Sequence, residues 1–445
     1  MYIKIISTVC AGVMLFAYAN SATRELSLEQ AIDIALRQNK SILVAKLNVQ
    51  RAESQVREAY GSAMPSVNVS AGFNHNIQLP VFFFPNAMTG EVVPIRVGET
   101  NVYSMTAQIQ QILFNGQVIT AIQTSNIYTD ATKAQLDASI AEVVTETKKK
   151  YYQALAASAY YDVAVATLEN VKQTRSTIEV LFKEGLVAEF DKIRADVAVA
   201  NTEPLVIEAG AGRYAAVAAL QTYLSMDLRD TVRVVFTELP EIAEIPDAEQ
   251  SIQQAMQSNA DLKAIELQIQ IAGKFIDLQS AEYYPTLAAF GQWQQQGQSN
   301  SLDSWRSATS SLVGLNLSMN LFNGLRTKSK VEQSRIDLTT AQERRAQIVD
   351  LIQLQTRTLV NQLSASKARI IAQRSSVSQA QRGYDIAQVR YKEGTGSLLE
   401  ISDAQTSLSR AKVNEVSARL DYHTNVADYD RVTGNIDSRY RAVIK

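Results

Sequence analysis

The chain has 445 residues, of which 46% are hydrophobic and 20% are charged, and its formal net charge is −2. This near-neutral balance gives no basis for expecting a nucleic-acid partner, because such proteins usually carry a basic excess. The chain contains only 8 prolines and 18 glycines, which favours long uninterrupted elements over many small domains.

The first segment, residues 1–21, has the features of a secretory signal peptide. Lys4 precedes an apolar run over residues 5–18, which ends in small residues with Ala17 and Ala19 in A-x-A spacing. The run is short for a transmembrane helix, and an N-terminal anchor is the alternative. Cys10 is the only cysteine and lies inside the run, so the mature chain is expected to have neither a disulfide nor a thiol nucleophile.

The rest of the chain is an internal duplication. Four landmarks recur in the same order in both halves: Glu-Gln-(Ala/Ser)-Ile at 29–32 and 249–252, Pro65 and Pro285, Leu-Phe-Asn-Gly at 113–116 and 321–324, and Lys-Glu-Gly at 183–185 and 392–394. The offset of the first landmark also pairs Asn39 with Asn259. Ordered recurrence of this kind indicates two copies of one structural unit.

Each repeat is predicted to contain a helix, two strands and a long helical hairpin. The first repeat is residues 22–236, with a helix over 27–62, strands over 66–79 and 102–114, and a hairpin over 117–226 whose tip is 183–191. The second repeat is residues 248–445, with a helix over 248–283, strands over 286–296 and 308–322, and a hairpin over 325–433 whose tip is 392–403. Residues 237–247 form the predicted linker, and Pro204 is expected to bend or break its helix.

Three of the predicted strands alternate strictly between apolar and uncharged polar residues. Val67, Val69 and Phe73 alternate with serine, asparagine and glycine, and the segments over 102–114 and 308–322 follow the same period. The segment over 286–296 alternates less clearly, because Phe290 interrupts its polar face. A half-buried soluble sheet has the same period, but its solvated face usually carries lysine and glutamate. An uncharged polar face is typical of a membrane barrel wall, which is apolar toward lipid and polar toward a water-filled lumen.

The two long helical runs, 117–183 and 325–392, contain no proline and are rich in small residues. Each has roughly 65 residues, which corresponds to about 100 Å of α-helix. Apolar residues recur every three or four positions, as in a coiled coil, and a solvated coiled coil without a pore has the same pattern.

Four strands are too few to close a membrane barrel, and open sheet edges are not tolerated in lipid. Strands from several chains must therefore be pooled. Two chains would give eight strands with a filled interior, and three would give twelve with room for a channel. Strand number alone does not choose between them.

Several motifs of this chain resemble those of the TolC-like outer-membrane efflux proteins. The residues that carry the resemblance are Gly-Leu-Val-Ala-Glu-Phe-Asp at 185–191, Tyr-Lys-Glu-Gly-Thr-Gly-Ser-Leu-Leu-Glu-Ile-Ser-Asp-Ala-Gln at 391–405, and the duplicated Leu-Phe-Asn-Gly. The resemblance implies a mixed fold in which a homotrimer forms a twelve-stranded membrane β-barrel and a long α-helical coiled-coil tunnel. It places the barrel in outer-membrane lipid and the tunnel in the periplasm.

The resemblance also implies a function and partners. The expected function is export from the periplasm to the exterior, as part of a tripartite efflux or type I secretion system with a periplasmic adaptor and an inner-membrane pump. It assigns two groups of residues: Asp191, Glu400 and Asp403 to a periplasmic gate, and Gly185, Leu186, Tyr391 and Gly394 to the tips that the adaptor approaches.

Two features of the second tip qualify this assignment. Some members have a basic residue just after the second tip glycine, where this chain has Gly396, so a latch from that position to the first-tip acid is not expected. Glu400 also has capping-box spacing from Ser397, which gives it a structural alternative to a gate role. Leu399 and Ile401 are expected to pack against neighbouring helices.

The sequence gives no candidate for catalysis. His75 and His423 are the only histidines, and no metal-ligand spacing, phosphate loop or nucleophile elbow is present, so no enzyme activity, metal or cofactor is expected. The alternative to a channel is a periplasmic or surface coiled-coil scaffold without a pore, which would not need uncharged alternating strands. The outer segments 80–100 and 297–307 give no indication of the cargo.

Overall fold

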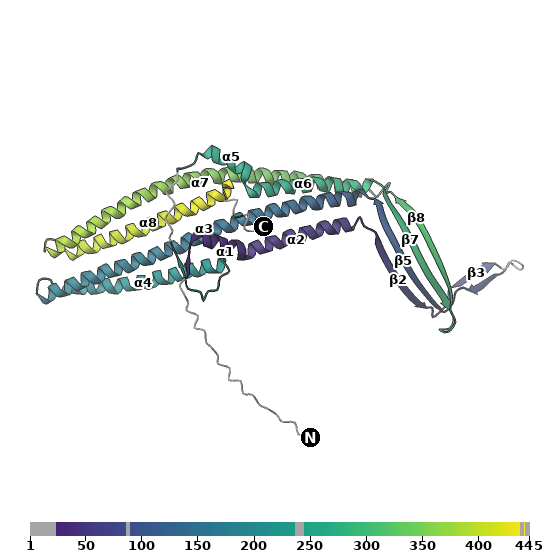
Figure 1. Cartoon of the computed structure of the whole chain (residues 1–445), viewed down its shortest axis with the longest axis horizontal. Helices are drawn as coiled ribbons and strands as arrows, with labels where there is room; N and C mark the ends of the chain where they lie inside the picture. Colours follow the sequence, from purple (N-terminus) through teal and green to yellow (C-terminus); the bar gives the residue numbers. More distant parts are fainter. Residues whose placement is uncertain (1–23, 86–89, 236–243, 437–439, 441–445) are drawn as a thin grey trace, which may run out of the picture.

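The computed structural model describes residues 24–85, 90–235, 244–436 and 440. The expected signal peptide, 1–21, and most of the expected linker, 237–247, lie outside the described residues. The described part is a long helical body with two helical tips at one end and a β-sheet at the other (Figure 1). Among the described helices, none is both long and apolar enough to cross a membrane. The mixed helical and strand architecture expected from the sequence is confirmed.

Two helical hairpins form the body. The first joins α3 (Gly116–Lys183) to α4 (Glu189–Tyr223), and the second joins α7 (Arg326–Lys392) to α8 (Leu398–Thr433). The long helices have 68 and 67 residues, which gives each a length of about 100 Å. Helices α3 and α8 are in contact, so the hairpins lie side by side (Figure 1).

The sequence predicts that Pro204 bends or breaks its helix. The prediction of a break is wrong, because α4 is continuous through Pro204. Pro204 is exposed, and α3 packs along α4 on the other side of the helix. Tertiary packing of this kind can maintain a helix across the backbone hydrogen bond that proline removes.

The single helices expected over 27–62 and 248–283 are each divided at an asparagine. The first consists of α1 (Leu28–Gln38) and α2 (Lys40–Gly61), and the second of α5 (Ala248–Ser258), α6 (Ala260–Ser280) and the 3-10 turn η1 (Ala281–Tyr283). Asn39 Oδ1 accepts a hydrogen bond from the Ser41 amide at 2.9 Å, and Asn259 Oδ1 accepts one from Leu262 at 3.0 Å. Each asparagine therefore caps the helix that follows it.

The same two asparagines connect these helices to the hairpins. Asn39 Nδ2 donates to the carbonyl of Tyr223, the last residue of α4, at 3.1 Å. Asn259 Nδ2 donates to the carbonyl of Val432, in the last turn of α8, at 2.9 Å. The last carbonyls of a helix have no partner within that helix, so one side chain satisfies the ends of two helices. The duplicated sequence thus forms the same connection in both repeats: an asparagine that bonds to the ends of two helices, called a joint below.

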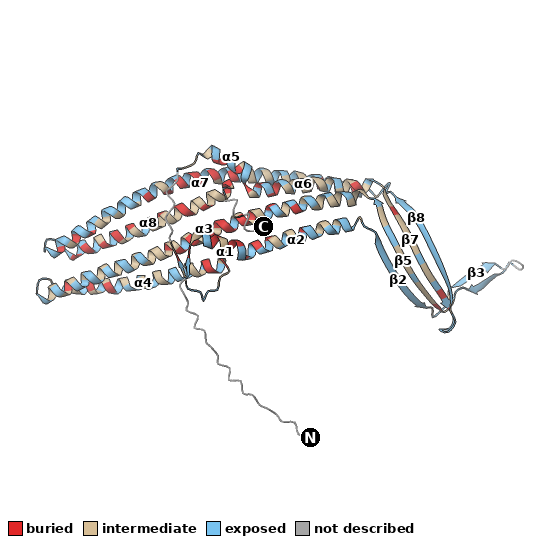
Figure 2. Ribbon diagram, viewed as in Figure 1, coloured by how far each residue is buried: buried red, intermediate tan, exposed pale blue. Residues whose placement is uncertain are grey.

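Two apolar clusters surround these joints, one in each repeat. The first includes Ala35, Ile42, Val144 and Leu220, and the second includes Ala255, Leu262, Ile352 and Val432. Both clusters lie in the middle of the molecule, where the short helices cover the long ones (Figure 2). These clusters therefore fix the C-terminal ends of α4 and α8 against the long helices, and the tips and the sheet extend away from them.

The sheet has four antiparallel strands in the order β2-β5-β7-β8. Their bounds are β2 (Ser66–His75), β5 (Asn101–Phe114), β7 (Thr286–Ser299) and β8 (Arg306–Ser318). The register places Val67 opposite Ile109 and Phe73 opposite Tyr103, so apolar residues share one face. On the other face, Gln108 lies opposite Gln292 and Thr106 opposite Gln294.

The outer strands of this sheet, β2 and β8, have no strand beside their free edges among the described residues. Their residues are almost all exposed, whereas those of β5 and β7 are mostly half-buried (Figure 2). Val313 is 88% exposed and Leu315 is 70% exposed in the isolated chain. A sheet with an exposed apolar face and two open edges is incomplete on its own.

The two Leu-Phe-Asn-Gly motifs differ in structure. In the first, the strand runs to Phe114, and Asn115 caps α3 by accepting from the Gln117 amide at 2.8 Å. In the second, β8 ends at Ser318, four residues before the predicted end at 322. The chain then reaches α7 through Leu325, which has a left-handed φ of 64°.

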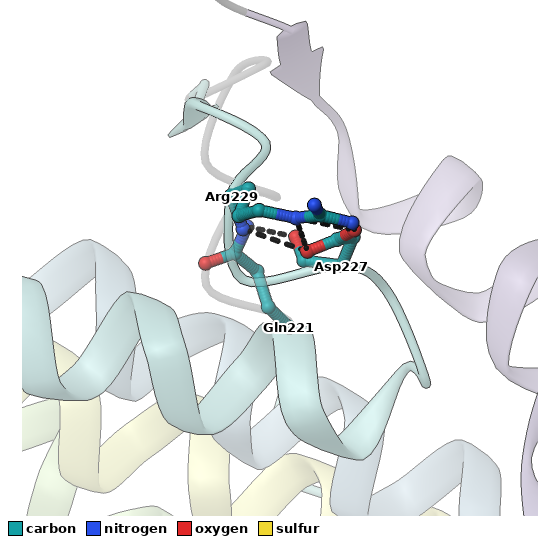
Figure 3. Close-up of polar contacts among 3 residues, drawn as sticks. All are labelled: Gln221, Asp227 and Arg229. Atoms are coloured by element: carbon teal, nitrogen blue, oxygen red, sulfur yellow. Dashed lines mark hydrogen bonds and ion pairs between the residues drawn. The ribbon is translucent and has the colours of Figure 1, made fainter.

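Two small strand pairs were not predicted. Strand β1 (Arg24–Leu26) pairs in parallel with β6 (Val232–Val234). The turn before β6 is held by Gln221, whose Nε2 donates to the Asp230 carbonyl at 2.8 Å. The same nitrogen donates to the Asp227 carbonyl at 3.3 Å, and Arg229 pairs with the Asp227 carboxylate (Figure 3). The outer segment 80–100 contains an antiparallel pair, β3 (Val81–Pro85) and β4 (Val92–Arg96).

Candidate functional site at the helical tips

The first tip is a tight turn between α3 and α4. Gly185 has a left-handed φ of 75°, and its amide donates to the Phe182 carbonyl at 2.9 Å. The Leu186 amide donates to the Leu181 carbonyl at 2.9 Å. These two bonds form a Schellman motif, which ends a helix and readily accepts glycine at the left-handed position.

The second tip repeats this arrangement. Gly394 has a φ of 72°, its amide donates to the Tyr391 carbonyl at 3.0 Å, and the Thr395 amide donates to the Arg390 carbonyl at 2.9 Å. Ser397 then caps α8, because its Oγ accepts from the Glu400 amide at 3.3 Å. The duplicated Lys-Glu-Gly motif therefore gives two helix ends of the same type.

An apolar cluster holds the two tips together. Ile178 and Ala195 from the first hairpin are buried in it with Tyr384, Leu398 and Ile401 from the second. The expectation that Leu399 would pack against neighbouring helices is not met within this chain, since Leu399 is exposed and Leu398 takes that place. The contact fixes the relative position of the predicted gate and docking residues.

Tyr391 is only 8% exposed, and its hydroxyl has no hydrogen-bond partner in the described part of the chain. Burial raises the pKa of this phenol, and the negative charge of Asp191 raises it further. Tyr391 therefore supports the tip from inside rather than lying on the surface that a partner would contact. Gly185, Leu186 and Gly394 are exposed at the turns.

The predicted gate acids lie close to the turns. Asp191 is in the first turn of α4 and is partly exposed. Glu400 and Asp403 lie three residues apart on α8, and both are exposed. Residues three apart on a helix share a face, so the two carboxylates point in similar directions.

The capping alternative for Glu400 is only half realised. In α1, Ser27 and Gln30 make both bonds of a capping box. In α8, only the bond from the Glu400 amide to Ser397 is present in the described structure. The Glu400 carboxylate instead pairs with Arg390, whose guanidinium lies 3.2 Å away. Sequence reasoning missed this pair, because its members are ten positions apart across a turn.

A separate hollow of about 1000 Å³ lies in the middle of the molecule, between α3, α4, α8 and β6. Its wall includes four acidic and four arginine side chains, so the balance of charge favours neither sign. The His423 ring stacks on Tyr152 with centroids 4.4 Å apart. Burial, followed by the charge of Arg419, lowers the pKa of His423 to about 4. This region shares no residue with the tips.

Comparison with known proteins gives a consistent result. The family model described as "Outer membrane efflux protein" matches residues 31–225 and 251–435, one segment in each repeat. The outer membrane protein TolC of Vibrio cholerae is 21% identical over 94% of this chain and 93% of its own length. Protein CyaE of Bordetella pertussis is 23% identical over 88% of this chain and 80% of its own.

Solved structures show the same fold. The CmeC outer membrane channel of Campylobacter jejuni superposes with a TM-score of 0.76, at 18% identity, over 92% of this chain and 85% of CmeC. The outer membrane protein VceC of Vibrio cholerae gives a TM-score of 0.73, at 17% identity, over 92% of this chain and 96% of VceC. The chain therefore belongs to the outer membrane efflux protein family, which is a family of outer-membrane channels and not of enzymes.

Proposed function

We propose that three copies of this chain form a channel that carries substrates from the periplasm to the exterior, as the outer-membrane component of a tripartite efflux or type I secretion system. The observation that carries the proposal is the β2-β5-β7-β8 sheet, with an exposed apolar face and two open outer edges. In lipid, such edges must be paired, and pairing β8 of one chain with β2 of the next closes a ring. Three chains contribute twelve strands, which leave room for a channel.

The helices support the same assembly. Within the two hairpins, the contacts run from α4 to α3 to α8 to α7, so α4 and α7 stand at the two ends of this row and have no extensive contact with each other in the described residues. Large apolar side chains are exposed on both of these helices, including Ile207 and Tyr214 on α4 and Ile371 and Ile386 on α7. Contact between α4 of one chain and α7 of the next would cover them and continue the ring as a helical tunnel.

At the inner end, we propose that Asp191, Glu400 and Asp403 line a periplasmic gate. Glu400 and Asp403 are exposed beside a turn about 100 Å of helix away from the sheet. Rings of carboxylates attract cations and repel anions in a narrow pore. The exposed turn residues Gly185, Leu186 and Gly394 form the surface that we propose for a periplasmic adaptor and an inner-membrane pump to approach.

The experiment that tests this proposal combines mass and conductance. Protein purified in mild detergent is expected to have the mass of three mature chains and to give stable single-channel conductance in planar bilayers. A monodisperse monomer with an intact sheet, or a trimer that never conducts, would contradict it. Copurification of the protein with an adaptor from cell membranes then tests the tripartite part separately.

A further inference from the structure

Arg390 is the residue around which the second tip closes. Its carbonyl accepts from the Thr395 amide at 2.9 Å, the Gly396 amide at 3.0 Å and the Thr395 hydroxyl at 3.2 Å. Its guanidinium donates to the Thr395 carbonyl at 3.1 Å and pairs with Glu400 at 3.2 Å. One side chain therefore connects the end of α7, the turn and the first turn of α8.

Gly396 makes this arrangement possible. A Cβ at position 396 would lie 3.0 Å from Arg390 Cβ and 3.1 Å from the Tyr391 amide nitrogen, both closer than ordinary contact. The turn is folded so closely onto Arg390 that a side chain at 396 would have to displace it. Gly396 cannot supply a positive charge, and Arg390 places one next to the gate acids instead.

The pair changes the charge that the tip presents. Glu400 is compensated by a guanidinium, whereas Asp403, one turn further along α8, is exposed and has no ion pair in the described residues. The Arg390 and Glu400 side chains are 51% and 44% exposed, so their pairing adds little to folding stability. The pair still changes the electrostatic potential at the tip, because the opposite charges of Arg390 and Glu400 largely cancel for an ion that is further away.

We propose that Arg390 is a specificity-determining residue of the gate: it holds Glu400 in a neutral pair and leaves Asp403 as the principal uncompensated carboxylate of each chain. The proposal rests on the function proposed above, because it concerns the inner end of that channel. In a trimer the gate then carries three effective negative charges on α8 rather than six. Removing Arg390 increases the negative charge of the gate, although the deleted group is not itself an acid.

The test is block of the reconstituted channel by lanthanum(III) chloride, measured in planar bilayers at low ionic strength. For Arg390→Gln, we expect the half-blocking concentration to fall roughly tenfold, because each chain gains one uncompensated charge facing a trivalent ion. Arg390→Lys keeps the charge and is expected to resemble wild type. Arg382→Gln is the matched control, since Arg382 is exposed on α7 about 12 Å from Arg390 and has no ion pair in the described residues.

A double variant, Arg390→Gln with Glu400→Gln, provides the second reading. It removes both members of the pair, so its block is expected to return to within about twofold of wild type. Block of Arg390→Gln equal to that of wild type or of Arg382→Gln would overturn the proposal, as would a double variant blocked as strongly as Arg390→Gln. If wild type neither conducts nor forms a trimer, the proposed channel itself is wrong, and the two failures are thereby distinguished.

Discussion

The joint at Asn259 allows a quantitative prediction. Its side chain caps α6 through the Leu262 amide and also donates to the Val432 carbonyl at the end of α8. Losing an N-cap costs about 1 kcal/mol. Leaving a buried carbonyl without a partner costs about 1–3 kcal/mol. Because Asn259 is 7% exposed, water cannot readily replace these bonds, and Asn259→Ala should lose about 2–3 kcal/mol of unfolding free energy.

Asn259→Asp separates the two contributions. Aspartate is as good an N-cap as asparagine, but it cannot donate to the Val432 carbonyl when ionised. The variant should therefore keep the cap and still lose at least about 1 kcal/mol at neutral pH. The unfolding free energy is measured by far-ultraviolet circular dichroism in a denaturant titration of detergent-solubilised protein, at one fixed protein concentration.

One control position and one equivalent position accompany this measurement. Asn414→Ala removes an exposed asparagine of α8 and should change stability by less than about 0.5 kcal/mol. Asn39→Asp removes the equivalent donor in the first repeat and should behave like Asn259→Asp. If both aspartate variants are as stable as wild type, the bonds between the short helices and the hairpins contribute nothing, and the reasoning fails.

Three further predictions concern single residues. Gly434→Ala should destabilise most, because φ is 69° and a Cβ would clash with the backbone carbonyl of Ser258. Gly394→Ala should cost only about 1 kcal/mol, since its surroundings are open, and helical Gly212→Ala should stabilise slightly; all three are read from denaturant midpoints. The pKa of His423 is lowered to about 4, so the stability that neutral His423 contributes is present above pH 6.5 and is lost as the pH falls toward 4. His423→Gln should therefore make the unfolding free energy less dependent on pH in this range. An unchanged pH profile would contradict this prediction. Tyr391→Phe removes a buried hydroxyl that has no hydrogen-bond partner in the described chain, so thermal melting should show equal or higher stability. A loss above about 1 kcal/mol would mean that this hydroxyl does form a hydrogen bond, which would contradict the prediction.

The tips and the sheet could be predicted from sequence because their signals are local. Gly185 and Gly394 take the left-handed conformation that ends a helix, and Ser397 starts the next helix three residues after the second glycine. The strict alternation around Val67 and Phe73 depends only on neighbouring positions. Such features are fixed within one turn of helix or a few residues of strand.

The missed features depend on contacts between distant residues. Asn39 and Asn259 lie within continuous amphipathic patterns, and their partners Tyr223 and Val432 are 184 and 173 positions away. The three-residue strand β1 pairs with β6 across about half of the chain, and its short sequence has no distinctive period. At the candidate site, Glu400 was assigned to a gate from its motif, and that role stays a prediction. Its partner Arg390 became visible only when the turn placed the two residues together.

In the proposed channel, β8 of one chain pairs with β2 of the next, and the ring closes at three chains. Cysteine cross-linking tests it directly, because the expected mature chain has no native cysteine. Ser70→Cys on β2 is combined in turn with cysteine at each even-numbered position of β8 from 306 to 318, because these positions share its face of the sheet and closing a barrel staggers the register between strands. Ser70→Cys alone is the control. For at least one pair, oxidation in membranes is expected to give a covalent ladder that ends at three chains on a non-reducing gel. Cross-links confined to single chains, or a ladder that continues past three, would contradict the account.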